Sequence, residues 1–183
     1  MFDLLGLTSI AIVSLLTLFV GLLRPNIFKI LLVALIVRVL VMLIGHYLVP
    51  LPDSTADAIS FEVTAWSLAQ VGFLNVLDAY IGPDPKFISL LIAIPYSLFG
   101  RSILMAKSIS LLFGMGSVFL GWKLAKMIWD KRIANRVGWV IALFPSLILY
   151  SALIMRESYI VFFLIVALCG VVIWVKNNNY KSL

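Results

Sequence analysis

Charged residues are scarce in this chain. Only 12% of its 183 residues are Asp, Glu, Lys or Arg, whereas 63% are hydrophobic. A soluble domain usually carries about 25% charged residues. Apolar runs of about 20 residues recur along the chain, and this is the length that an α-helix needs to cross a bilayer. The composition therefore excludes a soluble enzyme and predicts an all-α, polytopic membrane helix bundle without a soluble domain.

Cysteine is nearly absent, and so is a basic start. The one cysteine, Cys169, excludes an internal disulfide and any metal cluster built on cysteines, and its apolar neighbours indicate a buried thiol. The chain opens Met1-Phe2-Asp3, so the first apolar run is predicted to be a retained anchor. The net charge is +6, but there is no basic patch with interleaved polar residues, which argues against nucleic-acid binding.

The apolar runs predict five membrane-spanning helices. Their expected bounds are about 4–23, 27–49, 103–123, 137–154 and 159–175. A sixth apolar run, Phe87–Phe99, is too short to cross a hydrocarbon core about 30 Å thick at about 1.5 Å per residue.

The distribution of charge sets the predicted orientation. Lys and Arg collect in cytoplasmic loops, and here they collect in the links 24–29 and 123–136 and in the C-terminal tail. Residues 51–85 carry acids but no Lys or Arg. With that segment outside and 123–136 inside, only one span fits between them, so 87–99 should lie in the outer interface or dip into the membrane and return. The expected integral protein of a plasma or inner membrane has its N-terminus outside and its C-terminus in the cytoplasm.

The external loop, about 50–102, is predicted to hold two surface helices. One covers about 55–70, with Ser54 as N-cap, and its polar and apolar stripes are typical of a helix lying along a membrane. The other covers about 85–99 and is expected to begin at Asp84 and Pro85.

Two acids stand at the start of this loop. Asp53 and Asp57 follow the second span closely. A carboxylate there can take a proton from an acceptor hydroxyl, or hold a divalent cation through its oxygen atoms. The alternative is structural, with Asp57 favouring the positive end of a helix dipole and Asp53 solvated in the loop. The sequence leaves both interpretations open.

Arg156 and Glu157 are adjacent between the fourth and fifth spans. They are either the two charges of a tight turn, or an acid that faces Asp57 across a groove with an arginine available for a phosphate. The structural interpretation and the functional one remain open here as well.

Charged and kinking residues within the spans have structural expectations. Arg38 lies near the middle of the second span, where a charge is costly, so it should pair within the bundle or reach toward the surface. The lone His46 is expected to be structural. Pro145 should kink the fourth span, and its neighbour Ser146 could satisfy the backbone groups that the proline frees.

The order of these segments resembles a known family. An acidic loop start continues into an Asp-x-x-x-Phe-x-x-x-Ala run at Asp57–Ala65, and the second surface helix ends in Leu98-Phe99-Gly100. A span, a basic inner loop and a span with Phe144-Pro145-Ser146 follow, and that span closes at Ser151–Glu157. From about 27 to 175, the chain resembles the N-terminal half of a GT-C glycosyltransferase of the protein mannosyltransferase and aminoarabinose transferase type.

That resemblance implies transfer of a hexosyl or related sugar from a polyprenyl-phosphate donor to a glycan, lipid or protein acceptor at the outer membrane face of a cell envelope. It implies Asp57 as the base, Asp53 as a weaker match to the same acid, and Glu157 as a second essential carboxylate. These three acids would also hold a divalent cation, if one is used. The cations expected to meet the leaving lipid phosphate are Arg156, Arg101 and Lys86.

The chain also departs from the family pattern. It has an extra span before the first matching one, and it stops before the family core does. It is therefore expected to be a fragment, a truncated form, or a protein that works with a missing C-terminal half or second subunit. The alternative is a non-catalytic polytopic membrane protein, such as a lipid-linked-sugar flippase or an assembly subunit of a polysaccharide pathway.

Overall fold

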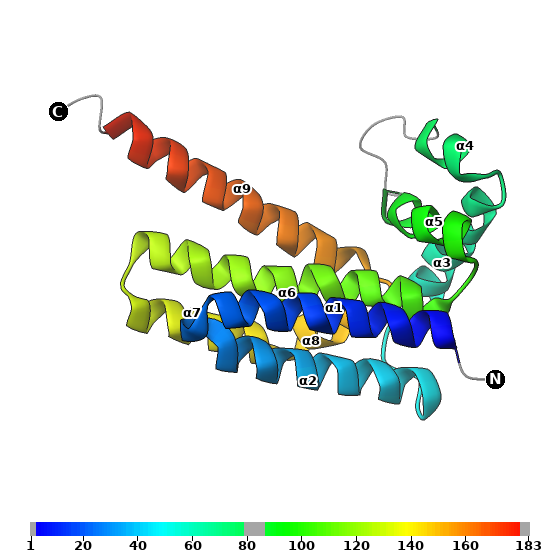
Figure 1. Cartoon of the computed structure of the whole chain (residues 1–183), viewed down its shortest axis with the longest axis horizontal. Helices are drawn as coiled ribbons and strands as arrows, with labels where there is room; N and C mark the ends of the chain where they lie inside the picture. The colour runs from blue at the N-terminus through cyan, green and yellow to red at the C-terminus, as the bar shows by residue number, and fades with distance from the viewer. Residues whose placement is uncertain (1–2, 79–86, 180–183) are drawn as a thin grey trace.

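The computed structural model describes residues 3–78 and 87–179 (Figure 1). Within these residues the chain forms nine α-helices and no strand. The helices are α1 Leu4–Leu23, α2 Pro25–Tyr47, α3 Ala56–Ala69, α4 Phe73–Asp78, α5 Phe87–Phe99, α6 Ile103–Ile128, α7 Lys131–Leu143, α8 Pro145–Ser151 and α9 Arg156–Asn179. The predicted all-α helix bundle is confirmed.

The long helices make this an integral membrane protein. Four of the described helices, α1, α2, α6 and α9, are long and apolar enough to cross a bilayer. The pair α7 and α8 is bent by 58° and makes a fifth crossing if it counts as one broken span. The helices α1, α2, α6 and α7 run along the long axis of the molecule and α9 is inclined to them, and the start of α1 and the end of α9 lie at opposite ends (Figure 1).

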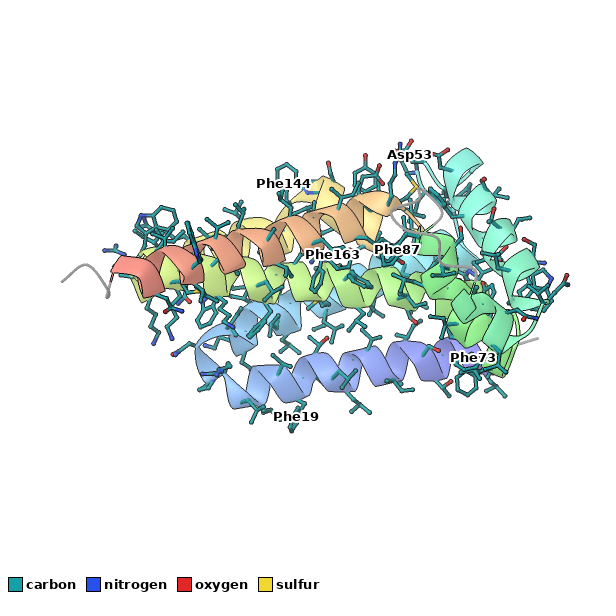
Figure 2. All side chains as sticks on the ribbon, turned by 90° about the horizontal axis from the view of Figure 1, so that it is seen from above. Phe19, Asp53, Phe73, Phe87, Phe144 and Phe163 are labelled. Carbon is teal, nitrogen blue, oxygen red and sulfur yellow. The ribbon has the colours of Figure 1, made fainter. Side chains whose placement is uncertain are left out.

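The outer surface of these helices is apolar. Phe19 on α1 and Phe144, between α7 and α8, both point away from the bundle (Figure 2) and are 60% and 51% exposed. An apolar surface of this extent is covered by lipid rather than water. The spans α6 and α9 are longer than predicted, because their polar ends continue as helix.

The central helix of the bundle is α6, which packs against α1, α2, α7, α8 and α9. Small residues allow the close approach. A Cβ at Gly114 would lie 2.4 Å from the Cβ of Ser151 in α8, and one at Gly121 would lie 2.3 Å from Ile141 Cδ1 in α7. The glycines therefore set how closely α7 and α8 approach α6.

Arg38 is fully buried and joins α2 to the break between α7 and α8. Pro145 has no N–H to donate, and the 58° bend leaves the last carbonyls of α7 without their helical partners. The guanidinium donates to Ala142 O at 2.7 Å and to Ile141 O at 3.1 Å. The predicted kink and the pairing of Arg38 within the bundle are both confirmed. Ser146, expected to satisfy the freed groups, makes no side-chain hydrogen bond to any described residue, so Arg38 replaces it.

Three short helices, α3, α4 and α5, gather at one end of the bundle (Figure 1). There α3 packs against α5. At 13 residues α5 is apolar but below span length, as the sequence predicts. The short helix α4 was not expected. The predicted cap at Asp84 and Pro85 lies outside the described residues.

The start of α3 differs from the prediction. Its N-cap is Thr55, which makes no capping hydrogen bond, rather than Ser54. The preceding turn contains Asp53 with a φ of 61°, in the left-handed region, which aspartate tolerates better than most residues. This turn directs Ser54 to the wall of a cavity instead of the helix end.

The opposite end of the bundle is basic. It contains the α1–α2 link, the α6–α7 link and the end of α9 (Figure 1). The basic side chains of these segments are Arg24, Lys29, Lys123, Lys126, Lys131, Arg132, Arg136 and Lys176.

Candidate functional site

A cavity of about 400 Å³ lies at the end of the bundle that carries the short helices. Its walls come from the C-terminal end of α2, the turn before α3, α3 itself, the start of α6 and the link between α8 and α9. The size is within the range of small-molecule binding sites. The cavity lies where the long apolar helices end and the short helices begin.

Lys107, in the second turn of α6, is the unusual residue of this cavity. It is only 8% exposed and lines the wall, yet it makes no hydrogen bond or ion pair with any described residue. A buried charge is costly unless an opposite charge or several dipoles meet it. The cavity therefore presents a cation suited to an anionic group that enters from outside.

His46, near the end of α2, lines the same cavity. Its ring packs edge-on against Tyr47, with the ring centroids 4.6 Å apart. That contact supports the structural role expected of this histidine. Its position on the cavity wall also leaves it able to donate a hydrogen bond to a ligand.

Glu62 is the one acid among the described residues that line this cavity, and it is held by a clamp. Arg101 Nε donates to Oε1 at 2.9 Å, and Arg101 Nη2 donates to Oε2 at 2.7 Å. Tyr96 Oη lies 3.0 Å from the same Oε1. Burial alone raises the pKa of the Glu62 carboxyl, but the Arg101 and Tyr96 hydrogen bonds and the Arg101 charge outweigh it and lower the pKa. Glu62 is therefore an ionised structural acceptor and a poor base.

The two residues that bind Glu62, Tyr96 and Arg101, both have raised pKa values. Burial and the charge of Glu62 raise the pKa of Tyr96. The hydrogen bond to Glu62 raises the pKa of Arg101, whose guanidinium also lies 5.8 Å from the centroid of the Trp66 ring. These groups all keep their protons, so the clamp binds α3 to α5 and to the start of α6.

The clamp continues to the N-terminal end of the chain. Tyr96 Oη also lies 3.0 Å from the Ser102 carbonyl oxygen, so its single proton serves one of two acceptors. Ser102 caps α6 by accepting from Met105 N, and its hydroxyl donates to Asp3. Asp3 in turn caps α1 by accepting from Gly6 N at 2.9 Å. The α1 end of the bundle is thereby fastened to the surface helices.

The predicted acids of the external loop do not line the cavity. Asp53 lies at the edge of the molecule beside α3 (Figure 2), and both it and Asp57 are exposed. Their neighbours Ser54 and Ala58 are wall residues instead. The structure therefore leaves both acids outside the cavity wall, next in sequence to residues that form it.

The predicted pair at the start of α9 is present but loose. Arg156 Nε lies 3.7 Å from Glu157 Oε1, and Glu157 Oε2 is buried without a hydrogen-bond partner among the described residues. Neither residue lines the cavity, although Leu153 and Ile154 just before them do.

Of the three cations expected to meet a phosphate, the structure brings Arg101 to the cavity wall, where Glu62 already occupies its guanidinium. Arg156 is exposed, and Lys86 lies outside the described residues. In the described part of the chain, no group of three or more His, Cys, Asp or Glu residues could hold a metal ion. Asp53, Asp57 and Glu157 therefore do not form the cation site considered from the sequence.

Sequence reasoning missed two residues of this cavity. Lys107 lies within a span, as Arg38 does, and a charge in a span is itself a signal for function. Glu62 falls on the buried stripe of α3, with Ala58 four residues before it and Ala65 three residues after. An acid on the buried face of an otherwise amphipathic helix indicates a partner elsewhere in the fold.

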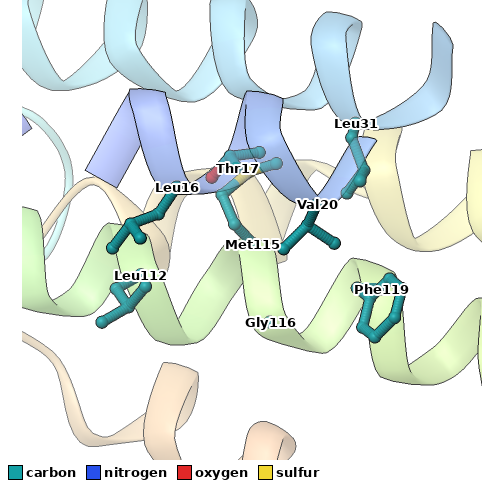
Figure 3. Close-up of a pocket in the computed structure, with 8 residues that line it drawn as sticks. All are labelled: Leu16, Thr17, Val20, Leu31, Leu112, Met115, Gly116 and Phe119. Carbon is teal, nitrogen blue, oxygen red and sulfur yellow. The ribbon is translucent and has the colours of Figure 1, made fainter. Parts of the chain in front are cut away.

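A smaller crevice of about 120 Å³ runs between α1, α2 and α6 (Figure 3). It is apolar except for Thr17, whose hydroxyl donates to Val13 O at 2.8 Å. It offers no group for catalysis.

Comparison of this chain with models of protein families, with curated proteins and with solved structures finds no match.

Proposed function

We propose that this chain is a membrane glycosyltransferase that takes a sugar from a polyprenyl-phosphate donor. The observation that carries the proposal is Lys107, a buried cation that has no partner among the described residues and faces a cavity where the long apolar helices meet the short ones. In the proposed arrangement, this position puts the cavity at the level of the membrane interface. A lipid phosphate is an anion delivered at that depth by its own hydrocarbon chain. Apolar wall residues such as Ile59, Val63 and Ile103 suit the first part of that chain.

The chemistry asked of the site is a single displacement. The acceptor hydroxyl oxygen bonds to the anomeric carbon while the bond from that carbon to the phosphate oxygen breaks. The electron pair of the broken bond stays on the lipid phosphate, where the charge of Lys107 stabilises it and His46 can donate a hydrogen bond. The acceptor proton passes to a carboxylate.

Asp57 is our candidate for that carboxylate. It immediately precedes Ala58, a wall residue, and it is exposed and unclamped. Glu62 lies closer to the cavity, but Arg101 and Tyr96 occupy its oxygen atoms. Asp53 is the second candidate, because it stands on the turn that brings Ser54 to the cavity wall.

The reaction side is proposed to be the outer face of the membrane. The end of the bundle with α3 and α5 carries the cavity, and the opposite end carries most of the Lys and Arg. Basic ends remain on the cytoplasmic side during insertion. The N-terminus would then be outside and the C-terminus inside.

One observation favours a second function. The three proposed carboxylates, Asp53, Asp57 and Glu157, are absent from the cavity wall. A protein that only binds or moves a lipid-linked sugar needs the cation but no base. The flippase or assembly-subunit alternative therefore predicts binding at Lys107 without sugar transfer.

Binding of polyprenyl phosphate to the purified protein in neutral detergent tests the shared part of both functions. Lys107→Met keeps the apolar stem and removes the charge. It should weaken binding about tenfold or more, because the anion loses the one unpaired cation among the described residues that line this cavity. Lys107→Arg should restore most of the affinity. Lys131→Met, an exposed lysine at the other end, is the matched control and should bind like the parent. Equal binding by the parent and Lys107→Met would overturn the proposal.

A further inference from the structure

A second cavity, of about 290 Å³, lies at the basic end of the bundle. Arg24, in the link between α1 and α2, forms one wall, and Trp122, Lys123 and Lys126 from the last turns of α6 form another. None of the described residues that line it is acidic. This cavity is at the opposite end of the molecule from Lys107, so an inference about it stands apart from the proposed transferase.

The cations of this cavity are not neutralised by the protein. Neither Arg24 nor Lys123 makes an ion pair or a side-chain hydrogen bond with any residue in 3–78 or 87–179. The Lys126 ammonium lies 5.1 Å from the centroid of the Trp122 ring, a contact that leaves its charge intact. Lys176 of α9 adds a further cation, because it donates to the carbonyl of Met127 on the same wall. The cavity is therefore suited to binding an anion.

An apolar crevice begins where the basic cavity ends. Phe119 lines both, and from it the crevice follows α1 and α6 back to Leu16 and Leu112 (Figure 3). From Leu112 to Phe119 an α-helix rises about 10 Å. Leu16 and Leu112 are 49% and 41% exposed, so this crevice opens toward the bilayer. A basic cavity that continues into a lipid-facing crevice fits a molecule with an anionic head and a hydrocarbon tail.

We propose that the basic cavity and the crevice together bind one anionic phospholipid. Its phosphate lies among Arg24, Lys123 and Lys126, and one acyl chain lies along the crevice. Basic pockets between helix ends on the cytoplasmic side are a known way of holding anionic head groups. The apolar crevice distinguishes the lipid from free phosphate, which would use only the basic cavity.

Native mass spectrometry of the purified chain, loaded with phosphatidylglycerol or phosphatidylcholine, tests the proposal. The parent should retain phosphatidylglycerol through detergent washing and lose phosphatidylcholine. The double variant Lys123→Gln with Lys126→Gln should retain phosphatidylglycerol at least about tenfold less well than the parent. The matched control, Lys131→Gln with Arg132→Gln, removes the same charge at the same end but outside the cavity, and should behave like the parent.

Two further arms separate the head group from the tail. Leu16→Trp fills the crevice and should reduce retention, whereas Leu15→Trp, on the exposed side of α1, should not. Glycerol phosphate at matched concentration should not displace the lipid. The proposal fails if both double variants lose phosphatidylglycerol equally, if the parent retains both lipids alike, if Leu16→Trp has no effect, or if glycerol phosphate displaces the lipid. A normal elution volume and helical circular dichroism spectrum confirm that each variant is folded.

Discussion

Lys107 and Glu62 are two buried charges in the same cavity, and their surroundings give them opposite roles. Glu62 has three hydrogen-bond donors around its carboxylate and is satisfied within the fold. Lys107 has no partner among the described residues and is satisfied only by something that enters the cavity. The contrast is what marks Lys107 as the residue for a ligand and Glu62 as part of the scaffold.

Asp57→Asn tests the catalytic half of the proposal. Removing a general base lowers the rate roughly 10²–10⁴-fold. Asparagine keeps the size of the side chain and loses only the favourable interaction of the charge with the first turn of α3, so stability should change by under about 1 kcal/mol. The measurement is sugar transfer in membranes with a polyprenyl-phosphate donor, at equal expression. Transfer at the parent rate would remove Asp57 from the mechanism, and Asp53→Asn would then be the next variant to measure.

Glu62→Gln should destabilise the protein by about 1–3 kcal/mol, because Arg101 loses its ionic partner. The partial exposure of Arg101 limits this loss, since water can solvate the guanidinium. The measurement is thermal unfolding in detergent at neutral pH. Glu157→Gln is the matched control, since Glu157 makes only a loose ion pair at 3.7 Å. An equal loss of stability in both variants would contradict the clamp.

The stabilisation that Glu62 contributes should decrease at low pH. The pKa of folded Glu62 lies below its ordinary value of 4.5, through the Arg101 and Tyr96 contacts. Its stabilising effect is therefore complete above that value and is lost as the pH falls through the folded-state pKa. The difference in melting temperature between parent and Glu62→Gln should be largest at neutral pH and shrink as the pH falls below 4.5 toward the folded-state pKa. A constant difference would contradict this account.

At the scale of the helix, the break between α7 and α8 and the buried Arg38 explain each other. A proline in a span exposes carbonyls to a medium that offers no hydrogen bond. An arginine in a span needs acceptors for the same reason. Arg38 lies on α2 at the depth of the break, so each feature satisfies the other. Of the three guanidinium nitrogens, only Nε has no partner among the described groups.

Arg38→Met should destabilise the protein by about 2–4 kcal/mol, because it leaves the Ile141 and Ala142 carbonyls unsatisfied. The same change should cost less in a Pro145→Ala background, where α7 can continue and satisfy its own carbonyls. Unfolding of the four proteins in detergent gives this coupling directly. Additive effects would show that Arg38 and the proline act independently.

At the scale of the whole molecule, the two ends differ in structure and in charge. One end has the surface helices, the clamp and the cavity with Lys107, and the other has the basic links and the second cavity. Such an asymmetric protein inserts in one direction, because basic segments resist translocation.

Cysteine labelling in intact cells tests this orientation. In a Cys169→Ser background, Ser60→Cys on the exposed face of α3 should react with a membrane-impermeant maleimide added outside. Arg132→Cys should react only after the membrane is permeabilised. Labelling in the reverse order would invert the topology and would move the proposed reaction to the cytoplasmic face.

Several features of the fold could be predicted from the sequence because their causes are local. Hydrophobic length selects the spans, and proline chemistry selects the break at Pro145. The amphipathic stripe of α3 and the short length of α5 indicate surface helices before any packing is considered. The acids at the loop start could be named as candidates, but nothing local says where their side chains lie.

What only the tertiary structure decided is which charges meet a partner. Arg38 donates hydrogen bonds to the carbonyls of Ile141 and Ala142, which are 103 and 104 residues later in the chain. Glu62 accepts from Arg101, which is 39 residues later. Asp57 has the better motif but is exposed and does not line the cavity, while Lys107, in a span with no motif, faces it. Hydrophobicity specifies which segments enter the membrane, but the contacts between those segments depend on the shape of every packed side chain. Whether a buried charge is satisfied is therefore decided by the assembled helices and not by its neighbours in the chain.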